Sequence, residues 1–190
     1  MARILMDRFS SAVIVESPHK ALDGLLRAGG IEPHRLDSVP DEDRLIEVIN
    51  EKGAQLLFKR SRVPVTRRLL EACPSLMVVQ LCCIGSDSVD LPACAEHGVL
   101  VFNDPISNGR SVVELVIGHL VALSRRLYET DVEMHDNDWK KTAAGRFEIL
   151  DKTLGIVGLG NIGRATARAA EAMGMDIAFF DNRFVAQEVG

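Results

Sequence analysis

Short apolar runs alternate with segments in which apolar residues recur at helical spacing along the first half of the chain. The run Ala12–Glu16 has the β-branched composition of a strand. The next segment, 19–28, places its apolar residues on one helical face before Gly29 and Gly30 end it. The same alternation predicts strands at 34–36, 54–58, 76–81 and 99–102, and helices at 41–52, 65–72 and 91–96. Strands separated by helices predict parallel β-α-β units, and therefore an α/β fold.

The pattern changes after Asn103. Ser111-Val-Val-Glu114 is typical of a capping box, so it predicts the start of a helix. Residues 112–123 are apolar on most sides, which predicts that this helix is buried between elements or domains. A polar stretch follows, and a further strand, helix and strand are predicted at 153–157, 162–173 and 176–181. We place the domain boundary near Pro105–Gly109, with one domain over residues 1–108 and a second over residues 109–190.

The clearest chemical motif is the G-x-G-x-x-G run that Gly158, Gly160 and Gly163 form between a predicted strand and a predicted helix. In the dinucleotide-binding fingerprint, the first glycine permits a tight turn and the second lets the backbone approach a pyrophosphate. The third glycine lets the helix pack closely. The N–H groups of Asn161 and Ile162 would then face the anion. The residues alone leave open that the glycines simply make a turn.

An acidic residue stands where this fingerprint requires one. Asp181 ends the predicted strand that follows the glycine motif. A carboxylate at this place accepts hydrogen bonds from the adenosine ribose and disfavours a 2′-phosphate, which favours NAD over NADP. Because Arg183 lies close by in the sequence, NADP stays an alternative cofactor. Asp181 could also simply end a strand, without any role in binding.

Composition limits the classes of protein that fit. The chain has 190 residues, of which 47% are hydrophobic and 26% charged, as in ordinary soluble domains. Its formal net charge of −5 argues against a general nucleic-acid binder. No apolar run approaches the roughly 18 residues that span a bilayer, and the N-terminus is not typical of a secretory signal, so we expect no membrane partner.

The four cysteines predict neither a metal site nor a disulfide framework, because none of them forms a C-x-x-C pair. We expect them to be reduced thiols that pack as small apolar side chains in a cytoplasmic protein. They are Cys73, Cys82, Cys83 and Cys94.

The order of several segments resembles the D-isomer-specific 2-hydroxyacid dehydrogenases. Leu81–Asp90, Asn103–Asn108 and Arg110–Gly118 precede the glycine motif in the order found in that family. Lys59–Arg62 and the stretch 139–148 are most similar to its bacterial D-3-phosphoglycerate dehydrogenase branch. The resemblance implies a flavodoxin-like substrate-binding lobe, a hinge helix and an incomplete Rossmann NAD-binding lobe.

The resemblance also implies roles for individual residues. The substrate-binding residues would be Arg60, Ser61, Arg62, Ile84, Gly85 and Asn108. A guanidinium at Arg60 offers a fork of donors to a phosphate or carboxylate. Ser86 would contact the cofactor. Without the family, the arginines could equally be solvated strand ends and Gly85 an ordinary turn.

The implied reaction is NAD-dependent oxidation of a small anionic D-2-hydroxy acid, most specifically 3-phospho-D-glycerate to 3-phosphohydroxypyruvate in L-serine biosynthesis. The alternatives are another 2-hydroxy acid, such as D-lactate, glyoxylate or hydroxypyruvate, or a non-catalytic, NAD-sensing, corepressor-like binding module. We expect a homo-oligomer, a dimer that forms through the hinge helix and residues 128–147.

The family takes its catalytic Arg, Glu and His from the later part of the Rossmann lobe, and no stretch of this sequence matches them. We therefore expect those residues beyond Gly190 and no turnover by this chain alone. The sequence fits two explanations: the chain is a portion of a longer dehydrogenase, or it is a naturally short relative without catalysis. In either case the apolar faces of the helix 164–173 and of its two flanking strands should be uncovered.

Overall fold

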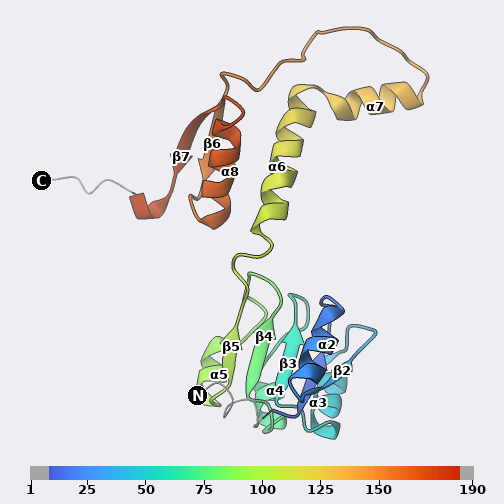
Figure 1. The fold of residues 1–190 in the computed structure, drawn as a ribbon, viewed down its shortest axis with the longest axis vertical. Helices are drawn as coiled ribbons and strands as arrows, with labels where there is room; N and C mark the ends of the chain where they lie inside the picture. Colours follow the sequence, from blue (N-terminus) through green and yellow to red (C-terminus); the bar gives the residue numbers. More distant parts are fainter. Residues whose placement is uncertain (1–8, 185–190) are drawn as a thin grey trace, which may run out of the picture. The chain divides into compact units, whose positions relative to one another are not determined.

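The computed structural model describes residues 9–184. The chain divides into two compact units, the first ending at Pro105 and the second beginning at Ile106. Each unit contains a parallel sheet of its own (Figure 1). The predicted α/β class is therefore confirmed.

Unit 1 is built on a five-stranded sheet. Its strands are β1 (Ser11–Ile14), β2 (Glu32–Arg35), β3 (Leu56–Lys59), β4 (Val78–Leu81) and β5 (Leu100–Phe102). They pair in the order β2-β1-β3-β4-β5, and every pair is parallel. This is the flavodoxin-like strand order, with the chain reversing its direction of growth between β1 and β3. The predicted flavodoxin-like lobe is confirmed.

Helices lie against both faces of this sheet (Figure 1). They are α2 (Ala21–Ala28), α3 (Glu42–Glu51), α4 (Arg67–Ala72) and α5 (Leu91–Glu96). Because successive strand side chains point to opposite faces, Val13 and Leu57 join one core while Ile14 and Leu56 join the other. Helices α3, α4 and α5 pack on the first core, and α2 packs on the second through Leu26.

Side-chain caps fix where helices of unit 1 begin. The Asp41 carboxylate accepts a hydrogen bond from the Arg44 N–H at the start of α3, and Thr66 does the same for Leu69 at the start of α4. Helix α4 therefore begins later than the predicted residue 65. Val65 is instead extended and pairs with Val89 in an isolated parallel bridge.

Unit 2 contains a two-stranded parallel sheet and three α-helices within the described residues. Its elements are α6 (Gly109–Ser124), α7 (Leu127–His135), β6 (Thr153–Val157), α8 (Asn161–Glu171), β7 (Asp176–Phe180) and a 3-10 turn, η1 (Asn182–Phe184). Strands β6 and β7 pair in register from Thr153 to Val157, and α8 connects them. Helix α6 packs against α8. The predicted strand–helix–strand series is present at 153–180.

The predicted capping box at Ser111 is wrong. Helix α6 begins three residues earlier than that box predicts, at Gly109, with Asn108 at the N-cap. Ser111 therefore lies inside the first turn, where its hydroxyl donates to the Asn108 carbonyl oxygen at 2.9 Å. Glu114 pairs with Arg110 at 2.5 Å instead of reaching back to a backbone N–H. The pattern was present, but its serine is one of the helical residues.

Much of helix α6 is exposed within the described residues, so its predicted burial between domains stays a prediction. Leu115 and Leu123 of α6 are 60% and 64% exposed. Arg126 takes a left-handed conformation, with φ of 54°, and separates α6 from α7. The sequence analysis assigned no element to the polar stretch after α6, but α7 forms a helix of nine residues there. None of those nine is buried.

The expected uncovered apolar faces are present on the small sheet. Val157 of β6 is 88% exposed, and Phe179 and Phe180 of β7 are 52% and 61% exposed. Within residues 9–184, every helix is too short or too polar to cross a bilayer.

We predict that Leu57→Ala lowers the free energy of unfolding of unit 1 by about 2–5 kcal/mol, since it leaves a cavity in a fully buried site of the central strand. Leu25→Ala is the matched control, because Leu25 is 71% exposed and surface changes stay within about 0.5 kcal/mol. Urea unfolding followed by circular dichroism measures both. Equal losses for the two variants would contradict the assigned core.

Candidate functional site

The predicted substrate-binding residues of unit 1 lie at the carboxyl ends of two neighbouring strands. Arg60, Ser61 and Arg62 directly follow β3, and the loop Ile84–Ser86 follows β4. Strands β3 and β4 pair in parallel, with Lys59 opposite Leu81, so both loops leave the same edge of the sheet. In open α/β sheets this edge is where ligands bind. The three residues of the first loop are exposed to solvent.

A buried carboxylate holds the first loop. Glu16, two residues after the end of β1, accepts hydrogen bonds from the backbone N–H groups of Arg60, Arg62 (2.5 Å) and Val63 (2.8 Å). Its side chain is 1% exposed, and the Arg62 guanidinium lies 3.9 Å away. Glu16 and Ser17 both have positive φ angles, of 61° and 51°. Such conformations cost about 1–3 kcal/mol each and persist only when surrounding contacts enforce them.

A buried lysine links the first loop to the second. Lys59, the last residue of β3, is completely buried, and its Nζ donates to the Ser88 hydroxyl at 2.6 Å. Burial lowers the pKa of Lys59, while the negative charge of Glu16 opposes that effect. The sequence analysis included Lys59 only as part of the segment Lys59–Arg62 that resembles the family, without a role of its own. Sequence reasoning missed Glu16 and Ser88 altogether.

Further hydrogen bonds hold the second loop on both sides. The Asn103 amide donates to the Ile84 carbonyl oxygen at 2.8 Å, from the end of β5. On the other side, Val65 donates its N–H to the Ser88 carbonyl and accepts from the Asp90 N–H, at 2.8 and 2.9 Å. The loop after β4 is therefore supported by backbone from both of its neighbours.

Asn108 belongs to unit 2. It is the N-cap residue of α6, and its Oδ1 accepts a hydrogen bond from the Ser111 hydroxyl at 2.8 Å. Its predicted contact with substrate stays a prediction.

The glycine motif of unit 2 forms the turn from β6 into α8. Gly158 has a φ of 94°, in the region that favours glycine, and its N–H donates to the Phe180 carbonyl at 2.7 Å. A Cβ at Gly163 would overlap the carbonyl oxygen of Gly158, so helix and turn meet there without room for a side chain. At Gly160 the same atom would meet open space. Asn161 and Ile162 open α8, where N–H groups lack helical partners and can face an anion.

Asp181 is bound into this turn. Its Oδ2 accepts the Leu159 N–H at 2.6 Å and the Arg183 Nη2 at 2.7 Å, while Oδ1 accepts the N–H and Nε of Arg183 at 2.9 and 2.8 Å. These bonds, the Arg183 guanidinium first among them, hold the pKa of Asp181 well below its usual range. The carboxylate is thus beside the glycine motif, as a ribose contact requires, but Arg183 occupies both of its oxygens.

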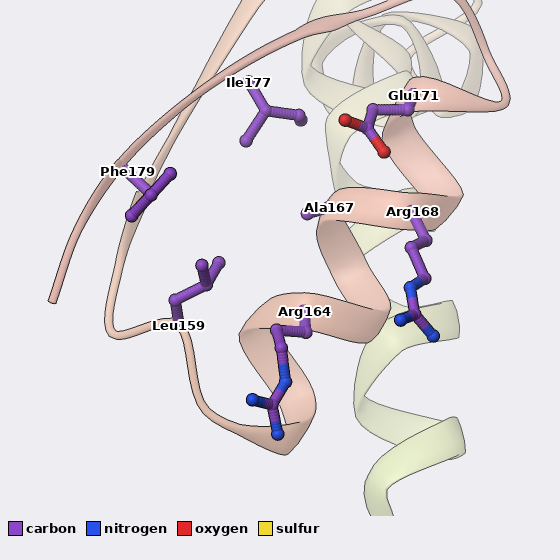
Figure 2. A pocket seen from close by; sticks show the side chains of 7 residues that line it. All are labelled: Leu159, Arg164, Ala167, Arg168, Glu171, Ile177 and Phe179. Atoms are coloured by element: carbon purple, nitrogen blue, oxygen red, sulfur yellow. The ribbon is translucent and has the colours of Figure 1, made fainter. Parts of the chain in front are cut away.

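A pocket of about 260 Å³ lies between α8 and β7 (Figure 2). Figure 2 shows Ile177 and Phe179 of β7 across from Ala167 of α8. Within residues 9–184, none of the predicted cofactor-binding residues lines this pocket. It is part of the uncovered apolar face and borders the glycine turn through Leu159.

The cysteines carry free thiols. Cys73 and Cys94 are buried in the core of unit 1, and burial raises the pKa of Cys73 to about 11. Among the described residues, no group of three or more His, Cys, Asp and Glu side chains is placed to hold a metal ion.

We predict that Gly163→Ala destabilises unit 2 by about 1–3 kcal/mol, since the added methyl group meets backbone that cannot move away. Gly118→Ala in α6 is the control, because a methyl group there meets open space. Urea unfolding followed through the amide resonances of β6 and α8 measures the difference. A Gly163→Ala protein as stable as the control would show that the close contact is absent.

We predict that Arg183→Gln raises the pKa of Asp181 towards its ordinary value, because the guanidinium is the main cause of the depression. Since the pKa in the folded state is depressed, the stabilisation by Asp181 is complete above about pH 4 and is lost as the pH falls further. A ¹³C carboxyl titration by NMR measures the midpoint, with Arg164→Gln as control. An unchanged midpoint in Arg183→Gln would contradict the assignment.

Comparison with known proteins places the whole described fold in one family. Residues 12–186 match the D-isomer specific 2-hydroxyacid dehydrogenase catalytic domain. The chain is 40% identical to the D-3-phosphoglycerate dehydrogenase of Escherichia coli over 185 residues, which are 95% of this chain and 44% of that protein. It is 41% identical to the Haemophilus influenzae enzyme of the same name over 170 residues, or 89% of this chain and 41% of that one. The chain thus spans less than half the length of these relatives.

Solved structures agree with this result. NAD⁺-bound 3-phosphoglycerate dehydrogenase of Entamoeba histolytica has a TM-score of 0.71 at 25% identity, covering 94% of this chain and 56% of its own. A protein from Thermus thermophilus has a TM-score of 0.80 at 28% identity, covering 94% of this chain and 58% of its own. From its matched residues and its fold, the chain belongs to the D-isomer specific 2-hydroxyacid dehydrogenase family.

Proposed function

We propose that this chain forms the substrate-binding lobe and the first part of the cofactor-binding lobe of an NAD-dependent dehydrogenase. The substrate is 3-phospho-D-glycerate, which the whole enzyme oxidises to 3-phosphohydroxypyruvate. The observation that carries the proposal is the pair of loops Arg60–Arg62 and Ile84–Ser86 at one sheet edge. It is supported by relatives about 40% identical that are named D-3-phosphoglycerate dehydrogenase.

The two loops suit a substrate with two anionic groups. Arg60 and Arg62 present exposed guanidinium groups, which bind phosphate or carboxylate through paired hydrogen bonds. The loop Ile84–Ser86 offers backbone N–H groups to the second anionic group. A substrate that carries both a phosphate and a carboxylate uses both loops, whereas D-lactate would use one. This difference favours the phosphorylated acid over the smaller 2-hydroxy acids.

The turn at Gly158–Gly163 suits the pyrophosphate of NAD. The open space at Gly160 lets the backbone approach the phosphates, and the N-terminus of α8 directs N–H groups toward them. When bound, NAD accepts the hydride from the hydroxyl-bearing carbon of the substrate. To bind the ribose, Asp181 gives up hydrogen bonds that it now accepts from Arg183 and accepts hydrogen bonds from the ribose hydroxyls instead. A carboxylate at this place favours NAD over NADP.

The exposed apolar side chains of α6 and of residues 128–147 form the surface through which the enzyme dimerises. Leu115, Leu123 and Trp139 belong to it, and they are 60%, 64% and 74% exposed. Burying apolar surface of this kind drives association.

We predict that Arg60→Gln weakens the binding of 3-phosphoglycerate to the chain by about tenfold, as expected for the loss of a charge-assisted hydrogen bond. Arg27→Gln is the matched control, since Arg27 is an exposed arginine of unit 1 on the helix α2. Isothermal titration calorimetry measures the affinity. D-lactate should bind more weakly than 3-phosphoglycerate to the unmodified chain. Equal affinities of Arg60→Gln and Arg27→Gln would contradict the assigned anion site.

We also predict that the chain alone does not reduce NAD with 3-phosphoglycerate. Hydride transfer requires a general base and a cation at the hydroxyl group, and no stretch of the sequence resembles the family segments that supply them. Absorbance at the wavelength of NADH measures the reaction. Reduced cofactor formed in proportion to the amount of chain would contradict this prediction.

A further inference from the structure

In unit 1, two charged side chains are buried and a polar partner is half-buried, although none of the three belongs to the predicted binding residues. Glu16 is 5% exposed, Lys59 is completely buried, and Ser88 is half-buried. Burying a charge is unfavourable unless it is paired and hydrogen-bonded. A lysine inside a parallel sheet, where apolar side chains would pack well, therefore needs an explanation other than core packing.

The hydrogen bonds of these three side chains connect to the two loops proposed to bind anions, Arg60–Arg62 and Ile84–Ser86. Glu16 accepts three backbone N–H groups from the loop that carries Arg60 and Arg62. Lys59 stands directly before that loop and donates to Ser88, which follows the loop Ile84–Ser86. The ammonium and the carboxylate also attract each other electrostatically.

Backbone pairing also joins the two loops. The Lys59 carbonyl accepts the Cys82 N–H at 2.7 Å, just before the second loop begins. Val65 pairs with Val89 just after both loops end. The two loops are thus joined through backbone on either side, and the Lys59–Ser88 bond is the side-chain link between them.

We propose that Glu16, Lys59 and Ser88 are positioning residues that hold the two loops in register, so that both present their donors to one doubly anionic substrate. Glu16 shapes the arginine loop, and Lys59 fixes the second loop relative to it through Ser88. The proposal rests on the function proposed above and adds to it the groups that set the spacing of the two anion sites.

The variants Ser88→Ala and Ser88→Thr separate positioning from folding. Both keep a small side chain at a half-buried position, but only threonine keeps the hydroxyl that accepts from Lys59. We expect Ser88→Ala to weaken the binding of 3-phosphoglycerate by about tenfold, the loss typical of one hydrogen bond to a charged group. Ser88→Thr should restore the affinity to within about twofold of the unmodified chain. Inorganic phosphate, which uses one loop, should be affected much less than 3-phosphoglycerate by either change.

Amide hydrogen exchange gives a second readout that does not depend on ligand. In Ser88→Ala, exchange at the amides of Arg60, Arg62 and Val63 should become faster, although the changed residue is in the other loop. Lys59→Met should have the same effect, and Lys52→Met is its control, since Lys52 is an exposed lysine of the same unit. A merely structural role would lower the unfolding temperature without a selective change in these amides.

The outcomes separate the two proposals. If the unmodified chain binds neither 3-phosphoglycerate nor phosphate, the proposed function of this edge fails, and the positioning role fails with it. If the unmodified chain binds 3-phosphoglycerate but Ser88→Ala binds it equally well, with unchanged exchange at Arg60–Val63, only the positioning role is overturned. If Ser88→Ala binds 3-phosphoglycerate more weakly and Ser88→Thr binds it as the unmodified chain does, both the proposed function and the positioning role are supported.

Discussion

All five strands of unit 1 run in the same direction, and the position of the candidate substrate site depends on this constraint. Parallel strands place their carboxyl ends at one edge, so β1, β3, β4 and β5 deliver Glu16, Lys59, Ile84 and Asn103 to neighbouring loops. Residues far apart in the sequence become partners without any long connection. The exposed arginines lie on a loop whose backbone N–H groups are held by the Glu16 carboxylate, and a fixed loop loses little entropy when an anion binds.

Charge at this edge is arranged in two layers. Glu16 and Lys59 lie beneath, where hydrogen bonds from backbone and hydroxyl groups compensate their desolvation. The guanidinium groups of Arg60 and Arg62 lie above, in solvent. In unit 2 a carboxylate also supports a binding turn, since Asp181 accepts the N–H of Leu159 within the glycine motif. In both units an acidic side chain at the end of a strand fixes the loop that carries the donors.

Much of this architecture follows from local pattern. Apolar runs predicted β1, β3, β4 and β5, and the glycine motif predicted the turn at Gly158, because both depend on neighbours in sequence. The prediction at 34–36 only overlaps β2 (Glu32–Arg35), because that strand is polar and has no apolar run to mark it. The residues that were missed act over long range. Nothing adjacent to Glu16 indicates that it binds backbone more than forty residues away, and the segment Lys59–Arg62 gives Lys59 no role of its own. The start of α6 was also misplaced, because a serine inside the first turn and a serine at the N-cap give the same pattern. The individual roles of the predicted binding residues remain predictions.

The central claim is that unit 1 binds the substrate and the glycine turn of unit 2 binds the cofactor. Amide chemical shifts of the unmodified ¹⁵N-labelled chain test it most directly, with 3-phosphoglycerate added first and NAD second. The first ligand should shift the amides of residues 59–63 and 84–88, and the second should shift those of residues 158–163 and Asp181. Shifts centred instead on the pocket beside Phe179, or no shifts at either set, would contradict the central claim.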